Sequence, residues 1–263
     1  MDARTETPAV LVTRNGALAV VTLNEPQSMN ALSPAIKEGL VHNLPPLLSD
    51  PDVRAIVITG AGKAFCAGGD IRAMDDRATV SMRTRMQRTY RWYLPLMTAD
   101  KPVITVVNGV AAGAGFSLAL AGDFVVAAKS ARFKAGFPGL GAVPDLALAY
   151  TLPRAVGMVR AKDILFTNRD VSAEEAYNIG LVSRLAEPET LMDTALAVAR
   201  DLAAGPTISL GLAKQLLLRA YELPLEGFLE LEGMAQTTAF GSADFAAGVE
   251  AFRAKRKAVF EGR

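Results

Sequence analysis

The chain has 263 residues, of which 51% are hydrophobic and 21% are charged, and its formal net charge is +1. This length allows one large domain or a domain with an appendage. The charge gives no electrostatic reason to expect nucleic acid or an anionic membrane as a partner, and no apolar run approaches the ~20 residues of a membrane span. With one cysteine, Cys66, and one histidine, His42, the chain has little material for a disulfide, a metal site or a histidine-activated nucleophile. We expect a cytoplasmic protein without a bound metal, because the N-terminus also lacks the apolar core of a signal peptide.

The first part of the chain predicts alternating strands and helices, which is typical of an α/β fold. Asn15-Gly16 lies between two β-rich runs and predicts a hairpin. Ser33 followed by Pro34 has the pattern of a helix N-cap and a first-turn proline. A strand follows that helix, so we expect a right-handed crossover that joins parallel strands. The expected strands are Ala9–Thr13, Ala17–Leu23, Arg54–Thr59, Val103–Val107, Phe124–Ala127 and Leu181–Leu185, and the expected helices are Pro34–Leu48, Ser81–Met97, Gly113–Ala121, Leu146–Leu152, Met158–Phe166 and Ser172–Ile179.

From Glu189 onward the pattern is helical only, with no strand signal. Each expected helix has an apolar face, and such a face requires a partner, which is either the core or a neighbouring subunit. The expected helices of this region are Glu189–Ala204, Thr207–Arg219, Glu226–Ala239 and Ala243–Ala258.

Small residues follow two of the buried strands, and each group forms a turn. Val103–Val107 is followed by the Gly/Ala-rich residues 109–115, and Ala55–Thr59 is followed by residues 60–70, which are also rich in glycine and alanine. N–H groups are free at a helix start, and a turn without bulky side chains lets a ligand approach the backbone closely. One such turn alone is explained by simple close packing. Two of them can direct two N–H groups at one point, which is the geometry of an oxyanion hole.

Six blocks in order along the chain resemble the crotonase superfamily, that is, the enoyl-CoA hydratase/isomerase family. Ala55–Ile71 resembles the first oxyanion segment of that family, and Lys101–Asp123 resembles the second. One block would carry little weight, whereas the six together cover nearly the whole chain. The other blocks are Ala19–Leu32, Pro144–Gly157, Ala173–Val182 and Ser242–Gly262.

The resemblance implies an α/β crotonase (ClpP-like) fold, in which a spiral of ββα units with the acyl-CoA site spans residues 1–200. It implies a C-terminal helical trimerisation region over residues 201–263, and assembly as a homo-trimer or a dimer of trimers. The implied ligand is an acyl-CoA thioester, and no separate cofactor is expected because coenzyme A is part of the substrate. By position, the oxyanion N–H groups belong to Gly69 and Ala114. Relatives more often have glycine at the second site, but the backbone donates in either case.

The resemblance also implies where the thioester binds. Arg72 is a candidate phosphate partner, and is equally well explained as a solvated charge at a helix start. Lys255 and Phe260 would meet the nucleotide in the same or a neighbouring subunit, or would simply be exposed. The implied substrate-binding and CoA-binding residues are Met29, Ala31, Ala67, Gly69, Asp70, Ile71, Arg72, Ala114, Phe137, Leu140, Lys255 and Phe260.

The acidic residues near the two turns bear on the reaction. Hydration of an enoyl-CoA usually engages two carboxylates, which position the water and manage its protons. Where hydratases of the family have glutamates, this chain has Ser117 and Phe137, which argues against efficient water addition. Asp145 is the remaining acid, at a position where the resemblance places one in isomerase branches and in an aryl-CoA dehalogenase. Spacing alone makes Asp145, after Pro144, a helix N-cap, whereas the family context makes it a catalytic base.

Some neighbours of these motifs have more than one interpretation. Cys66 has no histidine partner, so it is interpreted as a small buried side chain. Tyr150 lies one helical turn beyond Asp145 and would face either the pocket or the core. An apolar pocket would raise the pKa of Asp145 toward the working pH. Its expected residues are Phe137, Leu140, Val143 and Leu146.

Three functions stay open on the sequence alone. The first is an enoyl-CoA isomerase of fatty acid metabolism that uses Asp145 as its only base. The second is a hydratase of unusual mechanism, and the third is a non-catalytic member that binds acyl-CoA or RNA. The near-neutral charge argues against RNA, and a dehalogenase is disfavoured because His42 lies far from the motifs.

Overall fold

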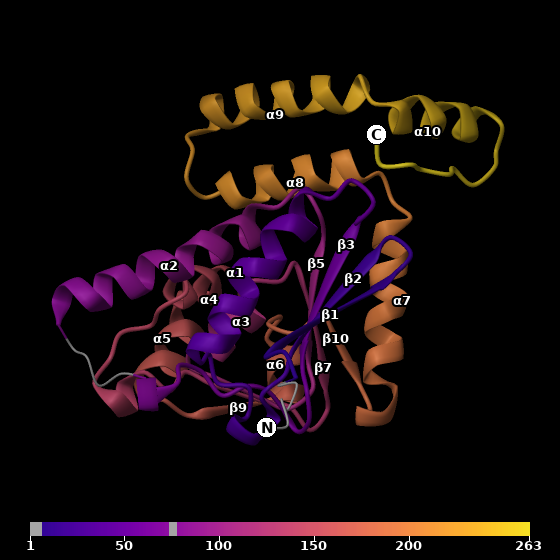
Figure 1. The fold of residues 1–263 in the computed structure, drawn as a ribbon. Helices are drawn as coiled ribbons and strands as arrows, with labels where there is room; N and C mark the ends of the chain where they lie inside the picture. Colours follow the sequence, from indigo (N-terminus) through magenta and orange to yellow (C-terminus); the bar gives the residue numbers. More distant parts are fainter. Residues whose placement is uncertain (1–6, 74–77) are drawn as a thin grey trace.

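In the computed structural model, which describes residues 7–73 and 78–263, the chain forms two β-sheets with helices packed around them (Figure 1). Within these residues the larger sheet has six strands in the order β1-β2-β3-β5-β7-β10. All neighbouring strands in it are parallel except those of the β1–β2 hairpin. Its strands are β1 (Val10–Asn15), β2 (Leu18–Leu23), β3 (Ala55–Gly60), β5 (Val103–Val107), β7 (Phe124–Ala128) and β10 (Arg184–Ala186).

The predicted hairpin, helix start and parallel pairing across the first crossover are confirmed. Gly16 has a φ of +59°, which the tight turn between β1 and β2 requires. The Ser33 hydroxyl oxygen accepts a hydrogen bond from the N–H of Ile36 over 3.1 Å, and so caps helix α1 (Pro34–Ser49). Strands β2 and β3, on either side of α1 in the chain, are parallel neighbours. Local sequence rules therefore determine this part of the fold.

A second sheet, which we did not predict, lies beside the small-residue turns. Within the described ranges it has four short strands in the order β4-β6-β8-β9. Three of them, β4, β6 and β8, follow β3, β5 and β7 along the chain, which gives the spiral of ββα units expected for the fold class. Each strand of this sheet has three residues, which is too short to show an alternating pattern. The strands are β4 (Ala64–Cys66), β6 (Val110–Ala112), β8 (Arg132–Lys134) and β9 (Asp170–Ser172).

Helices cover both faces of the larger sheet. Helix α7 packs against β3, β5 and β7 on one side, and α1, α2 and α3 lie on the other side (Figure 1). Helix α8 runs across one end of the sheet, and α9 and α10 extend beyond it. None of the helices in the described residues is long and apolar enough to cross a membrane. The further helices are α2 (Thr79–Thr98), α3 (Ala114–Ala119), α4 (Leu148–Val156), α5 (Met158–Thr167), α6 (Ala173–Asn178), α7 (Leu191–Ala203), α8 (Thr207–Arg219), α9 (Leu225–Phe240) and α10 (Ala243–Arg253).

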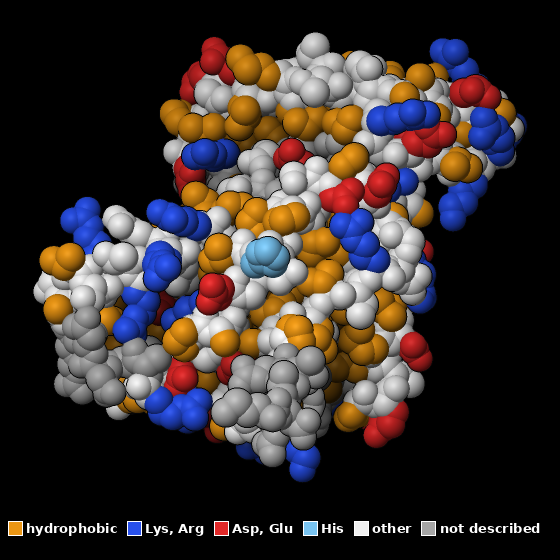
Figure 2. Space-filling model, viewed as in Figure 1, with side chains coloured by type: hydrophobic (Ala, Val, Ile, Leu, Met, Phe, Trp, Pro, Cys, Tyr) orange, Lys and Arg blue, Asp and Glu red, His pale blue; other side chains and the backbone are white. Residues whose placement is uncertain are grey.

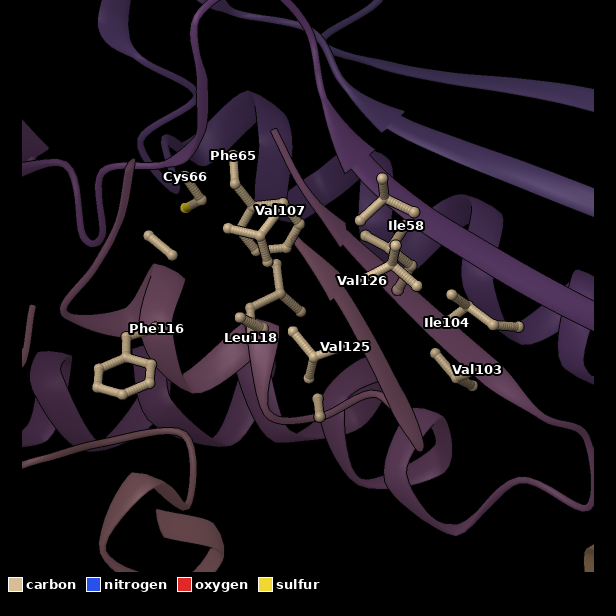
Figure 3. Packing of buried hydrophobic residues seen from close by; sticks show 14 of the residues in the cluster. Ile58, Phe65, Cys66, Val103, Ile104, Val107, Phe116, Leu118, Val125 and Val126 are labelled. Carbon is tan, nitrogen blue, oxygen red and sulfur yellow. The ribbon is translucent and has the colours of Figure 1, made fainter. Parts of the chain in front are cut away.

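The hydrophobic core runs continuously from the larger sheet to α3. Every residue of β3 and β5 is buried, as expected for parallel strands covered on both faces. Figure 3 shows side chains of Ile58, Val107 and Val126 from the sheet together with Phe116 and Leu118 from α3. Because α3 is buried along its whole length, its first turn is held in a fixed position.

Three predicted element boundaries are wrong. The helix expected over Leu146–Leu152 begins later and runs through Pro153 to Gly157, whose φ of +81° ends it. The strand expected over Leu181–Leu185 starts only at residue 184. The last helix ends at Arg253, five residues early, because the chain turns back there. The Asp244 carboxylate accepts hydrogen bonds from the N–H groups of residues 261 and 262, over 2.7 and 2.9 Å, and so anchors the returning tail.

Candidate active site

The two small-residue turns meet in the structure. Gly68 follows β4, and Gly113 follows β6 and leads into α3. A methyl group placed on Gly68 would lie 2.7 Å from the carbonyl oxygen of Ala112 and 3.5 Å from the nitrogen of Ala114. Gly68 has a φ of +105° and Gly113 a φ of +53°. The two backbones come this close because neither turn has a side chain at the point of contact.

Two N–H groups are available at this meeting point. Ala114 is the first residue of α3, so its N–H has no acceptor within the helix. Gly69 forms an isolated bridge with Leu32, in which the N–H of Leu32 donates to the carbonyl oxygen of Gly68 over 2.7 Å. In the described part of the chain, neither the Gly69 nor the Ala114 N–H donates to a loop or turn carbonyl. The pair therefore has the form of the predicted oxyanion hole.

The loop before α1 is tied to the first of these turns by Asn30. This residue is completely buried, and its side-chain amide donates to the carbonyl oxygens of residues 61 and 64, both over 2.8 Å. The carbonyl oxygen of Met29 accepts a hydrogen bond from the N–H of Ala67 over 3.0 Å. Three residues predicted to bind CoA, namely Met29, Ala31 and Ala67, are thereby brought together beside Gly69.

Asp145 precedes α4 but does not cap it. The N-cap of this helix is Ala147, without a side-chain hydrogen bond, and the N–H of Leu148 donates to the main-chain carbonyl of Asp145 over 3.1 Å. The backbone is left-handed at both Leu146 (φ +44°) and Ala147 (φ +57°), which is uncommon for residues with side chains. The interpretation of Asp145 as a helix cap is therefore wrong, because Ala147 occupies the N-cap position of α4.

Two hydroxyl groups hold the main chain at Asp145. The Ser117 hydroxyl donates to the carbonyl oxygen of Asp145 over 2.9 Å. The Tyr93 hydroxyl donates to the carbonyl oxygen of Leu146 over 2.6 Å and lies 3.1 Å from that of Ser117. Ser117 is about one helical turn after Ala114 on α3. These contacts attach the main chain at Asp145 to α3, the helix that begins at Ala114.

The Asp145 carboxylate has an unusual electrostatic environment. Burial raises the pKa of this carboxyl, and the positive charge of Lys37 opposes the rise in smaller measure. Its Oδ1 atom is buried and has no hydrogen-bond partner among the described residues. Lys37 projects from α1 and is half-buried, and its own pKa is lowered by burial and by Arg85. A carboxylate with a raised pKa and a free oxygen has the properties of a general base.

The expected apolar surroundings of Asp145 are only partly present. Phe137 and Leu146 are buried, whereas Leu140 and Val143 are 65% and 80% exposed. The short 3-10 helix Pro138–Leu140 carries Leu140 on the surface of the chain. In the free chain, Phe137 and Leu146 are therefore the buried members of the expected set, and the prediction that Leu140 and Val143 line a pocket around Asp145 stays a prediction.

The residues after Gly69 lie at the surface. The Asp70 carboxylate accepts hydrogen bonds from the N–H of Arg72 over 3.1 Å and from its guanidinium over 3.0 Å. Asp70 thereby caps the 3-10 turn Ile71–Ala73. The Arg72 side chain is still 76% exposed in this ion pair, so it has room to bind either solvent or a phosphate.

Lys255 and Phe260 are not brought to this site within one chain. The Arg54 guanidinium donates to the carbonyl oxygen of Phe260 over 2.9 Å, and Arg54 immediately precedes β3. The oxyanion turns follow the opposite end of β3, after Gly60, and a six-residue strand is about 20 Å long. Lys255 lies on the same C-terminal extension, just after α10.

Tyr150 and Cys66 do not belong to the site. The Tyr150 hydroxyl donates to the Glu222 carboxylate over 2.5 Å, so it faces the α8–α9 turn instead of the pocket or the core. The Arg154 guanidinium lies 3.4 Å from the centre of the Tyr150 ring. Cys66 is buried, and burial raises the pKa of its thiol to about 12, which agrees with a small core side chain.

We did not predict the proximity of Tyr93 or Lys37 to Asp145. For Tyr93 a signal existed, because Thr89, Trp92, Tyr93 and Leu96 recur at helical spacing and form the buried face of α2. The arginines of the same helix obscured it. Lys37 follows the N-cap of α1 by one turn, but a lysine there is ordinarily a solvated charge. Only the folded chain indicates that Lys37 acts on Asp145.

The arrangement can stabilise an enolate and move a proton. Negative charge on a carbonyl oxygen placed between the Gly69 and Ala114 N–H groups would be stabilised by about 3 kcal/mol for each donor. Asp145 can take the proton whose loss creates that charge. The site thus combines the two functions that proton abstraction next to a carbonyl requires.

Comparisons with known proteins point in the same direction. A family model described as enoyl-CoA hydratase/isomerase matches residues 13–263. The 1,2-epoxyphenylacetyl-CoA isomerase of Escherichia coli K12 is 40% identical over 247 residues, which cover 92% of this chain and 94% of that protein. The short-chain-enoyl-CoA hydratase of Clostridium acetobutylicum is 34% identical, with 94% and 95% covered. A crystal structure of an enoyl-CoA hydratase/isomerase from Cupriavidus metallidurans CH34 superposes with a TM-score of 0.91 at 31% identity, covering 97% of this chain and 96% of that one.

Proposed function

Because this chain belongs to the enoyl-CoA hydratase/isomerase family, we propose that it shifts a double bond in an enoyl-CoA, with Asp145 as the only base. The observation that carries the proposal is Asp145, whose carboxylate has a buried oxygen without a hydrogen-bond partner and whose main chain is bound by Ser117 of α3, the helix that begins at Ala114. A single base is sufficient for a double-bond shift, because one carboxyl can serve both carbon atoms.

The reaction follows from these groups. Asp145 takes a proton from C2 of a 3-enoyl-CoA, and the electron pair of the C–H bond moves into a dienolate whose charge lies on the thioester oxygen. The N–H groups of Gly69 and Ala114 stabilise that oxygen. The protonated carboxyl then returns the proton to C4, which gives the 2-enoyl-CoA. Coenzyme A enters as part of the substrate, so we propose that no further cofactor is needed.

The side chains at the other two acid positions favour isomerisation over hydration. Ser117 is completely buried and donates to the main chain of Asp145, and Phe137 is an apolar side chain. Neither can take a proton from water. The isomerase name of the E. coli relative agrees with this choice, whereas the hydratase names of other relatives make hydration the competing outcome of the test.

The test offers a trans-3-enoyl-CoA and a trans-2-enoyl-CoA separately to the purified protein. We expect isomerisation of the first and little hydration of the second. Asp145→Asn should lower kcat by about 10²- to 10⁴-fold, the usual contribution of a general base. Asp52→Asn, which changes an exposed acid before β3, is the matched control and should leave kcat unchanged. Hydration that survives Asp145→Asn would contradict the proposal.

The pH dependence provides a second test. The base must be ionised, and burial raises its pKa. The kcat/KM for isomerisation should therefore fall as the pH decreases through this raised pKa, at a higher pH than the ordinary ~3.9 of an aspartate predicts. A profile that is flat down to pH 4 would show that Asp145 is not the base.

We also propose that the protein works in the cytoplasm as a homo-trimer or a dimer of trimers built on its C-terminal helices. Figure 2 shows a band of hydrophobic side chains along α9, and such a band requires a covering surface. Light scattering should give three or six times the chain mass, and a monomer would contradict the proposal. The exposed hydrophobic residues of α9 and α10 include Leu225, Leu229, Met234, Phe240, Phe245 and Phe252.

A further inference from the structure

The turn that carries Asp145 is held in an unfavourable backbone conformation. Leu146 and Ala147 are consecutive left-handed residues, and neither is the glycine or asparagine that tolerates this conformation. Such residues persist only where their surroundings enforce the geometry, and they concentrate at functional sites. The Leu146 side chain is 2% exposed, so core packing fixes one end of the turn.

The other constraint comes from two hydroxyl groups on different helices. Tyr93, from α2, donates to the carbonyl oxygen of Leu146, and Ser117, from α3, donates to that of Asp145. The Tyr93 hydroxyl also lies within 3.1 Å of the Ser117 carbonyl oxygen, which links the three segments. Neither hydroxyl contacts the carboxylate of Asp145. They act only on the main chain that carries it.

Without these bonds the sequence favours a different local structure. An aspartate after a proline at a helix start would ordinarily accept a hydrogen bond from an N–H of the first turn. The N–H groups of the helix would then stabilise the ionised carboxylate and turn it away from the oxyanion pair. In the structure, Ala147 occupies the N-cap position instead, and Oδ1 of the Asp145 carboxylate has no hydrogen-bond partner among the described residues.

We propose that Tyr93 and Ser117 are positioning residues, which hold the Asp145–Ala147 main chain in its left-handed turn and thereby keep the Asp145 carboxylate free beside Gly69 and Ala114. This inference rests on the proposed function, since it assumes that Asp145 is the base. It also assigns a role to Ser117, which lies where hydratases have a glutamate: it orients the base and does not act on water.

The first experiment needs no turnover. The Asp145 carboxyl is titrated by ¹³C NMR in the free protein, and its signal is identified by its loss in Asp145→Asn. The charged and titratable groups that act on the carboxyl are Lys37 from α1 and Tyr93 from α2, and Lys37 remains in every variant. In Tyr93→Phe and Ser117→Ala, the pKa should fall toward or below the ordinary ~3.9, because helix N–H groups become available to the ionised form. Tyr90→Phe, which changes an exposed tyrosine one turn earlier on α2, should keep the wild-type value.

The second experiment measures turnover. Tyr93→Phe and Ser117→Ala should lower kcat by about 10- to 100-fold while KM changes by less than about twofold, because a displaced base still leaves the thioester bound. The Ala147→Gly background should reduce the loss caused by Tyr93→Phe, since glycine takes the left-handed turn without being held. If either single variant fails to fold, the other carries the test.

The two experiments separate this inference from the proposed function. A wild-type protein without isomerase activity would refute the proposed function, while the NMR titration would still decide whether the hydroxyl groups control the Asp145 carboxyl. An unchanged Asp145 pKa in both Tyr93→Phe and Ser117→Ala would refute the positioning role, whatever the wild-type protein catalyses. Equal losses of kcat with and without Ala147→Gly would also count against it.

Discussion

The two halves of the site use left-handed backbone in opposite ways. The oxyanion turns take it at Gly68 and Gly113, where glycine removes both the strain and the side chain. The turn before α4 takes it at Leu146 and Ala147, which have side chains and are held by hydroxyl groups. In the first half, the absence of side-chain atoms lets the two backbones approach each other. In the second half, hydrogen bonds from other helices hold the backbone in place.

This difference fits what each half must do. The donors of the oxyanion pair belong to the backbone, so the two main chains must come close together, and any added atom would separate them. The proposed base, Asp145, is a side chain, so its main chain has only to be directed correctly, and hydrogen bonds from other helices can do that. The first half should therefore be intolerant of substitution, and the second should depend on residues distant in the sequence.

The largest expected effect is on the glycine side, at Gly115. A methyl group there would lie 2.0 Å from the carbonyl oxygen of Cys66, which is backbone and has no freedom to move aside. Gly115→Ala should therefore lower the free energy of unfolding by about 3 kcal/mol or more. Urea denaturation measures this. The control is Gly233→Ala on α9, where nothing lies within 4 Å of the added methyl and a gain of up to about 1 kcal/mol is expected. Equal stability of the two variants would contradict the tight contact between α3 and β4.

An intermediate effect is expected at the proposed base, Asp145. The folded-state pKa of Asp145 is raised by burial, so its favourable contribution to stability is complete below the unfolded-state pKa and is lost as the pH rises through the folded-state pKa. At neutral pH the ionised Asp145 carboxylate therefore lowers the free energy of unfolding. Asp145→Asn should raise the free energy of unfolding at pH 7 by about 0.5–2 kcal/mol, and the gain should disappear near pH 4.

Asp244→Asn is the matched comparison for that stability change. The Asp244 carboxylate accepts two backbone hydrogen bonds, so its replacement should lower the free energy of unfolding at pH 7 by about 1–3 kcal/mol. If both variants lower the free energy of unfolding equally, the Asp145 carboxylate stabilises the fold as that of Asp244 does. The expectation that Asp145 lowers stability at pH 7 would then be refuted.

Features that depend on local sequence could be predicted, whereas features that depend on contacts between distant segments could not. The hairpin at Gly16, the cap at Ser33 and the two small-residue turns follow local rules, and each was predicted from a few adjacent residues. The second sheet was missed because its strands have three residues each and gain their order only from pairing. Pairing between distant segments leaves no periodic pattern in the sequence.

The geometry at Asp145 could not be predicted for a related reason. Leu146 and Ala147 give no sign of a left-handed turn, and the rule for an aspartate after Pro144 indicates a helix cap. Tyr93, 53 residues before Leu146, and Ser117, 28 residues before Asp145, hold a different geometry there through hydrogen bonds to the main chain. The family resemblance selected Asp145 as the candidate base, and the local geometry that keeps it from capping α4 comes from tertiary contacts.

The smallest expected effect tests whether the turn before α4 is strained at all. Relief of a left-handed alanine is worth about 1–2 kcal/mol, and the extra freedom of glycine in the unfolded chain costs about 0.5–1 kcal/mol. Ala147→Gly should therefore raise the free energy of unfolding by about 0.5–1 kcal/mol. Ala149→Gly, at an exposed helical position of the same helix, should lower it by about 1 kcal/mol. If both substitutions lower the free energy of unfolding equally, the turn is not strained. Tyr93 and Ser117 would then not be needed to keep it in the left-handed conformation.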